Sequence, residues 1–468
     1  MRTVLALGAL GLLVLPALAH GEGWEWTGPH GRVRARGYGY TKRLEHLEDG
    51  AGRLDAWGEF GLTNGEAWTF RATPWAWAMG PYTVGGDLAA ARPFFDVKEA
   101  WAEFARTGWD ARIGYQTFAW GRADGVNPVD LINPRDLTDL LDSEKLAVPA
   151  ARVRLHPSSM EGWGLELVGG PTFRSSRLPA KLPSAAEGPV LFSPEDGRWL
   201  ESLPSFVSAG GILTPLVYEM EPVSYPATPW GAVRLSKSGL GSWDLALTAF
   251  DGVEHEPRMA ATQRGSTGSP TLPVTVEVHP SFHRQQSLGL DGSTVWEIAE
   301  GKDVGFRFEG AYVHRDNDRA EAAAAELRDQ LLKDDYVHAV AGLDYNFPHK
   351  VVGTDLYVNL QYSFYERLAG PEQTPGVAGL PALPTALPWD REIILVMQNK
   401  FEQKFTLQNL VIWSHRRGDG LYRPSLAAEW SDTFTTTLGA DLPFGSPLGF
   451  FGQYSENGRV ALTAEWAF

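Results

Sequence analysis

The sequence has no cysteine among its 468 residues, and only 21% of its residues are charged. Without cysteine the chain can form no disulfide scaffold, no zinc ribbon and no thiol nucleophile. The formal net charge of -16 leaves no positive field that would neutralise the phosphates of a nucleic acid. Beyond its first 20 residues the chain also lacks the run of roughly 20 apolar residues that a membrane helix needs, which excludes an α-helical transporter.

What the sequence does contain is 43% hydrophobic and 12% aromatic residues, which excludes intrinsic disorder. Its N-terminus has the pattern of a secretory signal peptide. Arg2 is followed by an apolar stretch at 4–15 and by the small-x-small triplet that ends at Ala19. We therefore expect a signal peptide at 1–19, cleavage after Ala19, and a mature chain of one domain, 20–468.

Most of the mature chain alternates apolar and polar residues with a period of two. In the segment 355–366, Leu356 and Leu360 fall on one face, and Asn359 and Gln361 fall on the other. The same pattern recurs at 152–155, 243–249, 304–312 and 336–346. Repeated strands of this design are typical of a barrel with lipid outside and water inside. The last strand ends at Phe468, an aromatic terminus that resembles the signal read by the outer-membrane assembly machinery.

The links between these strands alternate in length. Short links occur at 63–66, 107–108, 158–162, 238–241, 348–354 and 402–403, and long links occur at 81–93, 122–147, 171–228, 252–280, 315–334 and 367–388. Outer-membrane barrels pair short periplasmic turns with longer extracellular loops. The sequence therefore predicts an all-β protein, a transmembrane antiparallel β-barrel of about 18 strands, or 16 as the alternative, in the outer membrane of a Gram-negative bacterium. Both termini should be periplasmic.

The segment 122–149 differs from the other long links. It contains two Asn-Pro pairs, which favour turns, and leucines whose spacing predicts short helical pieces. Because its apolar residues need a dry partner, we expect this loop to fold into the barrel mouth and narrow the pore. Its aspartates lack the spacing of an EF-hand, so we expect neither a metal site nor a cofactor. A second helix is expected at 319–335, within a long link.

The interior of a barrel of about 18 strands is wide enough to hold water. From the parity of the strands we expect the pore and its constriction to be lined by Glu99, Glu103, Arg112, Gln116, Phe118, Trp120, Asp130, Arg135, Asp136, Arg152 and Arg154. Two alternatives remain open. Neighbouring arginines and carboxylates on such a wall often only neutralise each other, and the aromatic residues would equally suit packing under an infolded loop.

One block of the sequence resembles a known family. Gly114, Gln116, Trp120 and Gly121 are followed by Gly-x-Asn-Pro-x-Asp at 125–130 and by the Val-Pro pair at 148–149. This pattern is similar to the hallmark block of Gram-negative outer-membrane barrels catalogued as a domain of unknown function, with a weaker similarity to alginate-export-type porins. The resemblance implies a barrel that works with an inner-membrane exporter of the RND type. It implies no catalytic residues.

The expected function is a channel for small solutes, or for export of a hydrophobic or polysaccharide substrate. The alternative is a non-conducting structural or partner-docking barrel. No catalytic motif is present, so we expect no enzyme. The expected partners are outer-membrane lipid, the assembly machinery, and an inner-membrane transporter or periplasmic carrier.

Overall fold

The computed structural model describes residues 23–44, 47–65, 67–80, 82–84, 87–89, 92–192, 197–200, 203–300, 302–347, 353–368, 391–402, 404–447 and 449–468. The signal peptide expected at 1–19 and most of the long link at 367–388 lie outside these residues. Among the residues described, no helix is both long and apolar enough to cross a membrane.

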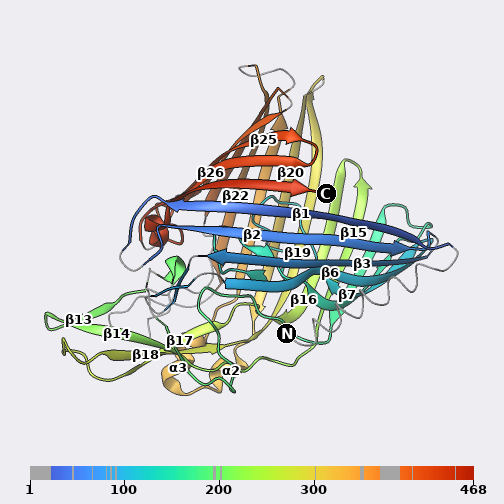
Figure 1. The fold of residues 1–468 in the computed structure, drawn as a ribbon. Coiled ribbons are helices and arrows are strands. Elements are labelled where there is room, and N and C mark those ends of the chain that lie inside the picture. Colours follow the sequence, from blue (N-terminus) through green and yellow to red (C-terminus); the bar gives the residue numbers. More distant parts are fainter. Residues whose placement is uncertain are drawn as a thin grey trace.

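The chain forms a closed antiparallel barrel of 18 strands (Figure 1). Each strand pairs with the next in sequence, and the last pairs with the first, from Arg32 opposite Ala467 to Tyr40 opposite Arg459. The expected strand number and connectivity are therefore confirmed. In order around the wall the strands are β1 (Glu25–Tyr40), β2 (Gly50–Thr63), β3 (Trp68–Gly80), β6 (Arg92–Arg106), β7 (Trp109–Gln116), β10 (Val148–Leu155), β11 (Trp163–Gly170), β15 (Trp230–Leu240), β16 (Trp243–Val253), β19 (Arg284–Ala299), β20 (Lys302–Arg315), β21 (Tyr336–Asn346), β22 (Asp355–Arg367), β23 (Glu392–Phe401), β24 (Phe405–Ser414), β25 (Asp419–Ser431), β26 (Phe434–Gly445) and β27 (Arg459–Ala467).

Alternate residues along the strands face opposite sides of the wall. On β22, Leu360 and Tyr362 are exposed, whereas Asn359, Gln361 and Ser363 are buried inside the barrel. Exposed aromatic residues gather near the short links and again near the other end of the wall. At the first level are Trp68, Trp109, Trp163, Trp296, Trp430 and Trp466, and at the second are Tyr312, Tyr362, Trp413, Tyr422 and Phe444. An apolar band between two aromatic girdles is the lipid-facing surface of a transmembrane barrel.

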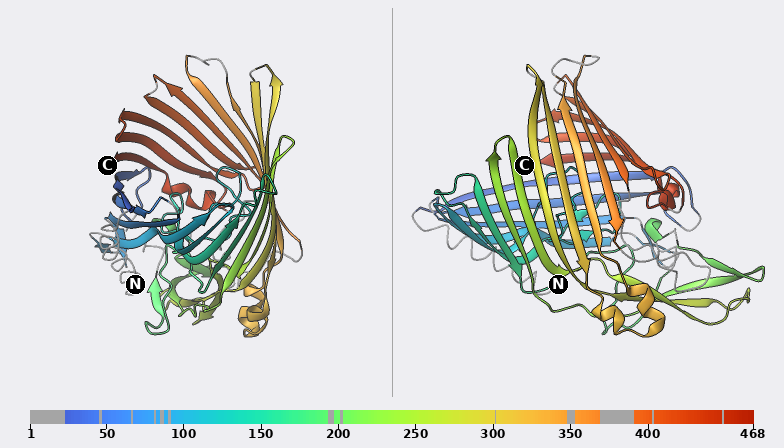
Figure 2. Two further views of the ribbon diagram at one scale, coloured as in Figure 1. Left: turned by 90° about the vertical axis from the view of Figure 1, so that its right-hand side faces the viewer. Right: turned by 180° about the vertical axis from the view of Figure 1, so that it is seen from behind.

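A second, smaller sheet lies beyond the end of the barrel that carries the long links (Figure 2). It is built from β12 (Val190–Phe192), β13 (Phe206–Ala209), β14 (Ile212–Met220), β17 (Arg258–Arg264) and β18 (Val274–Ser281). Its core contains Tyr218, Val274, Val276 and Val278, all with almost no exposure. The long links at 171–228 and 252–280 are therefore partly folded, whereas the sequence indicated only loops there.

The helix expected at 319–335 forms as two short pieces, α2 (Asp318–Glu321) and α3 (Ala325–Leu331). Leu331 and Ala320 pack against Ala260 of β17. The amide of Gln330 also bonds the free backbone edge of β17, donating to the carbonyl of Ala261 and accepting from its N–H at 2.9 and 2.8 Å. These helices therefore protect a sheet edge that would otherwise be open to pairing.

Candidate functional site

The interior of the barrel is crossed by the segment 117–147, which links β7 to β10 and is called here the infolded segment (Figure 2). The short helical pieces expected within it do not form. Every residue of this segment is described, and its only regular structure is the two-residue ladder of β8 (Arg135–Asp136) and β9 (Glu144–Lys145). Helix is disfavoured because Pro128 and Pro134 interrupt the segment and because side chains take several of its backbone N–H groups.

The base of the infolded segment is closed by Asn133. Its amide nitrogen donates to the carbonyls of Gln116 and Leu146 at 3.1 and 2.9 Å, and its amide oxygen accepts from the N–H of Phe118 at 2.6 Å. One buried side chain therefore joins the start, middle and end of the segment. This accounts for the second of the two Asn-Pro pairs.

Apolar residues of the infolded segment pack on the inner wall, as expected. Phe118, Trp120, Val129 and Ile132 form a core with small and aliphatic wall residues, namely Ala150, Val168, Ala232, Phe250, Ala311 and Val313. Leu146 packs against Trp75 and Trp77 of β3. The predicted lining residues Phe118 and Trp120 are thus buried between the segment and the wall and do not face water, which supports the packing alternative for them.

Carboxylates near the end of the segment bind a basic part of the wall. Glu144 pairs with Arg34 of β1 at 2.8 Å and also with Lys98 of β6. Asp142 pairs with Arg36. Asp139 pairs with Arg459 of β27 at 2.6 Å.

Residues near the start of the segment bind the opposite wall. The carboxylate of Glu309 on β20 accepts the backbone N–H groups of Arg122 and Ala123. The Arg122 side chain pairs with Asp291 of β19 at 3.0 Å. Asp124 pairs with Arg307 of β20 at 3.0 Å and accepts from the amide of Asn359 of β22 at 3.0 Å. The segment is therefore bound to two opposite sides of the barrel wall.

Two glycines of the block 114–130 are explained by this arrangement. Gly114 has φ of +135°, and a Cβ there would lie 2.2 Å from the carbonyl oxygen of Ala100. Gly121 has φ of +100°, and a Cβ there would lie 2.6 Å from both carboxylate oxygens of Glu309. Each position needs a residue without a side chain.

Three predicted constriction residues have structural partners within the loops. Asp130 pairs with Lys145, and Asp136 pairs with Arg177 at 2.8 Å. The Arg135 backbone N–H donates to the hydroxyl of Ser176 at 2.9 Å. Because the Asp130 and Asp136 side chains are almost fully buried, they are poorly placed to meet a passing solute.

The predicted wall residues come together in one network on β6, β7 and β10. Glu103 pairs with Arg112 and Arg152 at 2.7 and 2.9 Å, and Asp110 pairs with Arg152 and Arg154, each at 3.0 Å. Arg112 also lies 3.6 Å from the ring centre of Trp101. Glu99 accepts from the Trp101 indole at 2.9 Å, and Gln116 donates to the carbonyl of Ala150 at 2.8 Å. Arginines and acids on this wall do pair, as the neutralising alternative expected.

Several residues of the site are not among those expected from the sequence. Arg53, Lys98 and Arg459 were not among the expected lining residues, although Arg53 and Arg459 are buried against the carboxylates of Asp55 and Asp139. Their strand parity was a usable signal for the inward face. Nothing in the sequence identified their partners on a segment so distant along the chain.

The fold and the infolded segment define a class, a transmembrane barrel whose interior is crossed by one of its own loops. An apolar outer band and aromatic girdles are the build of outer-membrane proteins, so the chain lies in the outer membrane of a Gram-negative bacterium.

Comparisons with solved structures agree on this fold. The chain is similar to two outer-membrane porins of Acinetobacter baumannii, OccAB4 and OccAB1, each with a TM-score of 0.50. Identity is 9% and 6%, with 96% of this chain covered in both cases, and 99% and 97% of the respective partner. OccK5 (OpdH) of Pseudomonas aeruginosa aligns with a TM-score of 0.49 at 8% identity, over 96% of this chain and 98% of that one. No family model matches the sequence, and no curated protein does.

Proposed function

We propose that this protein is a porin-like channel that passes small polar solutes, and that the infolded segment narrows its pore. The observation that carries the proposal is the charged inner wall on β2, β3, β6, β7 and β10. There Glu59 and Arg71 keep about two-fifths of their side chains exposed, at 41% and 38%. Charged groups that stay accessible inside a barrel favour a water-filled path.

The same wall argues against export of a hydrophobic substrate. Such a path would need exposed aromatic residues, but Trp75, Trp77, Phe118 and Trp120 are each less than 5% exposed. The channel is therefore proposed for hydrophilic solutes. Its direction of transport is set by the solute gradient, because a passive pore has no other source of free energy.

Cysteine labelling tests the path directly, because the chain has no cysteine of its own. Glu59→Cys places a thiol on the inner face of β2, and Leu54→Cys places one on the lipid face of the same strand. A charged, water-soluble methanethiosulfonate should lower the single-channel conductance of Glu59→Cys in planar bilayers and leave that of Leu54→Cys unchanged. Equal responses of the two variants would show that this wall does not line the conducting path.

Deletion tests the constriction. Removing residues 129–141 takes away Ile132, Asp136 and Asp139 and their contacts, so single-channel conductance should rise while the barrel still inserts. A deleted protein that inserts and conducts like the wild type would show that the segment does not limit flow. Absence of current from both proteins would favour the alternative, a non-conducting barrel that docks an inner-membrane exporter of the RND type or a periplasmic carrier.

A further inference from the structure

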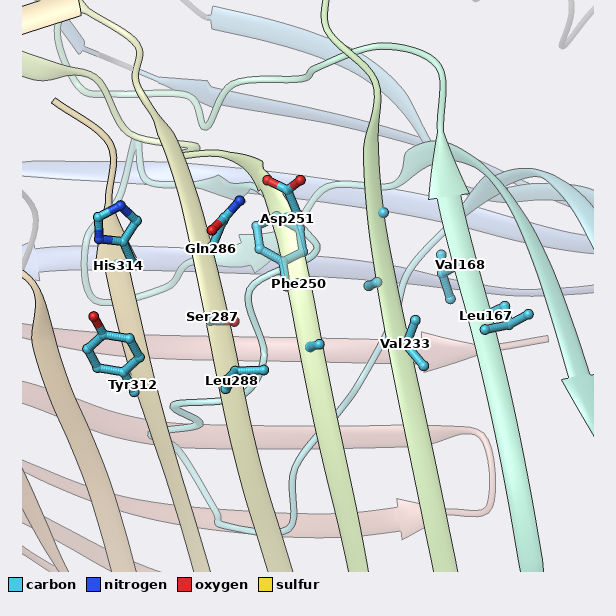
Figure 3. Close-up of a pocket in the computed structure, with 13 residues that line it drawn as sticks. Leu167, Val168, Val233, Phe250, Asp251, Gln286, Ser287, Leu288, Tyr312 and His314 are labelled. Atoms are coloured by element: carbon cyan, nitrogen blue, oxygen red, sulfur yellow. The ribbon is translucent and has the colours of Figure 1, made fainter. Parts of the chain in front are cut away.

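One side chain, His255, joins the infolded segment to two of the long links. The link that carries it continues from β16, whose Phe250 (Figure 3) packs in one core with Ile132 of the infolded segment. The imidazole Nδ1 of His255 lies 2.9 Å from the carbonyl oxygen of Arg174, which belongs to the link between β11 and β15. Its Nε2 lies 3.1 and 3.0 Å from the carbonyl oxygens of Leu131 and Ile132. These contacts form a junction of three chain segments that are far apart in the sequence.

Backbone hydrogen bonds continue this junction. The carbonyl of His255 accepts the N–H of Ser176 at 2.9 Å. The N–H of Leu137 donates to the carbonyl of Arg177 at 2.8 Å, and the N–H of Arg177 donates to the carbonyl of Arg135 at 2.9 Å. The link after β11 thus lies beside β8 as a short further strand. Because a ladder this small is only marginally stable by itself, the side chains at the junction decide how firmly the segments are held together.

Both ring nitrogens of His255 face carbonyl oxygens, which accept hydrogen bonds and cannot donate them. A neutral imidazole has one N–H, so its other nitrogen would present a lone pair to a carbonyl oxygen. The imidazolium ring has an N–H on both nitrogens and satisfies both sides. The ring of Phe173 also stacks on the imidazole, with 5.9 Å between ring centres and 9° between planes, and an aromatic face attracts a cation at this distance. The geometry therefore matches the charged form of the ring.

The charged groups around the junction have partners of their own. In the link of His255, Glu254 pairs with Arg258, and Glu256 accepts from the hydroxyl of Ser176 at 2.6 Å. On the two facing segments the pairs are Arg174 with Asp96, Arg177 with Asp136, and Asp130 with Lys145, and Arg135 reaches the hydroxyl of Ser143 at 3.5 Å. The ring of His255 contacts the three carbonyl groups and Phe173. Its charge is therefore the variable that changes the junction between pH 5 and 8, where histidine ordinarily titrates.

We propose that protonation of His255 stabilises this junction and so holds the infolded segment in place. The charged ring donates to Arg174 on one side and to Leu131 and Ile132 on the other. As the pH rises and the ring becomes neutral, one of the two donors is lost and the junction loosens. His255 is only half-buried, so protons from the surrounding water reach it. The pH-dependent junction rests on contacts between described residues, and its effect on flow through the pore rests on the proposed function.

Amide hydrogen exchange of the purified full chain in detergent tests the junction directly. Exchange is followed by mass spectrometry at pH 5.5 and pH 7.5, and each rate is divided by the rate of the unfolded peptide at the same pH. In the wild type, the peptides that contain the N–H groups of Leu137, Ser176 and Arg177 should be protected roughly tenfold more at pH 5.5, because hydrogen bonds from a charged donor are the stronger ones.

Variants without a titrating ring should lose this difference. His255→Gln can still donate to one side of the junction, and His255→Phe keeps a ring on Phe173, and each should show the same protection at both pH values. His283→Phe is the matched control. His283 accepts the N–H of Glu254 at its carbonyl and lies close to the junction, but burial lowers the pKa of its ring to about 4. It is neutral at both pH values, so its variant should keep the wild-type difference.

The effect on flow is measured in planar bilayers. The single-channel conductance of the wild type should be lower at pH 5.5 than at pH 7.5, and that of His255→Gln should be the same at both. Absence of current would contradict the proposed function, and the exchange rates would still decide the role of His255. All variants are first checked for an intact barrel by heat-modifiable migration in gels. The proposal is overturned if wild-type protection is equal at the two pH values, if both His255 variants keep the difference, or if His283→Phe loses it.

Discussion

At Gly121 the infolded segment lies close to the carboxylate of Glu309 on the wall. The φ of +100° at Gly121 and the nearby carboxylate of Glu309 both exclude a side chain. Gly125 has a similar φ of +98° but no atom within 4 Å of its Cβ position. The two glycines therefore separate backbone strain from the loss of the Glu309 contact.

We expect Gly125→Ala to cost about 1 kcal/mol of backbone strain, and Gly121→Ala to cost about 2 kcal/mol more, because the carboxylate must leave the two partly buried N–H groups of Arg122 and Ala123. The measurement is the free energy of unfolding in urea from lipid vesicles. Similar values for the two variants would show that Glu309 does not hold the segment.

His283 makes the loop region sensitive to acid. It is fully buried between β18 and β19, outside the membrane-spanning strands. Burial, together with the nearby Arg258 and Arg319, lowers its pKa from 6.5 to about 4, although Glu254 and Asp316 partly offset this. Between these two values the unfolded chain binds a proton that the folded chain does not. Stability contributed by the neutral ring is therefore full above pH 6.5 and is lost as the pH falls toward 4.

The loss should reach at most about 3 kcal/mol. Limited proteolysis of the small sheet should therefore be faster at pH 4.5 than at pH 7.5 in the wild type. In His283→Phe, which has no titrating group there, the rates at the two pH values should differ much less. An unchanged pH dependence in this variant would assign the effect to other groups.

At the scale of the element, strand alternation was predictable and strand partners beyond the neighbours were not. Alternation with a period of two is visible within about ten residues, so β22 could be predicted as a strand from its own sequence. The infolded segment was predicted to enter the barrel because its leucines need burial, but helix could not be excluded from sequence. Helix is lost here because the Glu309 and Asn133 side chains accept backbone N–H groups of the segment. Which side chains lie close enough to do so is decided by the complete fold.

The small sheet shows the same limit. Val274, Val276 and Val278 alternate with Thr275 and Glu277, a pattern as clear as that of many barrel strands. The alternation of link lengths places this segment in the long link at 252–280, and its parallel partner β14 lies far away along the chain. Nothing local distinguishes a strand in a long link from a strand in the wall.

The two faces of β26 provide a test of the lipid boundary. Leu438 is exposed on the outer face, and Thr437 is on the inner face, opposite Thr463 of β27. Leu438→Arg should cost about 2–4 kcal/mol near the middle of the bilayer, and Thr437→Arg far less. Sequence alone would have chosen Asn359 as the inner control, but Asn359 is buried and bonds Asp124. Equal costs in folding assays with lipid vesicles would place β26 away from the membrane.

For the whole molecule, the alternating links predict which end faces outward. Lys181 and Arg264 are exposed in the region of the small sheet, and Arg106 is exposed beside the short link between β6 and β7. Trypsin added to intact cells should cleave after Lys181 or Arg264 and spare Arg106, whereas trypsin added to opened cells should also reach Arg106. Cleavage after Arg106 in intact cells would reverse the orientation.

The ion pair between Asp139 and Arg459 joins residues 320 positions apart in the chain. The infolded segment is thus synthesised early, but part of its docking surface is supplied by the final strand. During biogenesis the docking surface of the segment is incomplete until β27 pairs with β1. We therefore expect docking of the infolded segment to be completed only when this seam closes, so that a barrel arrested before it would keep the segment partly undocked.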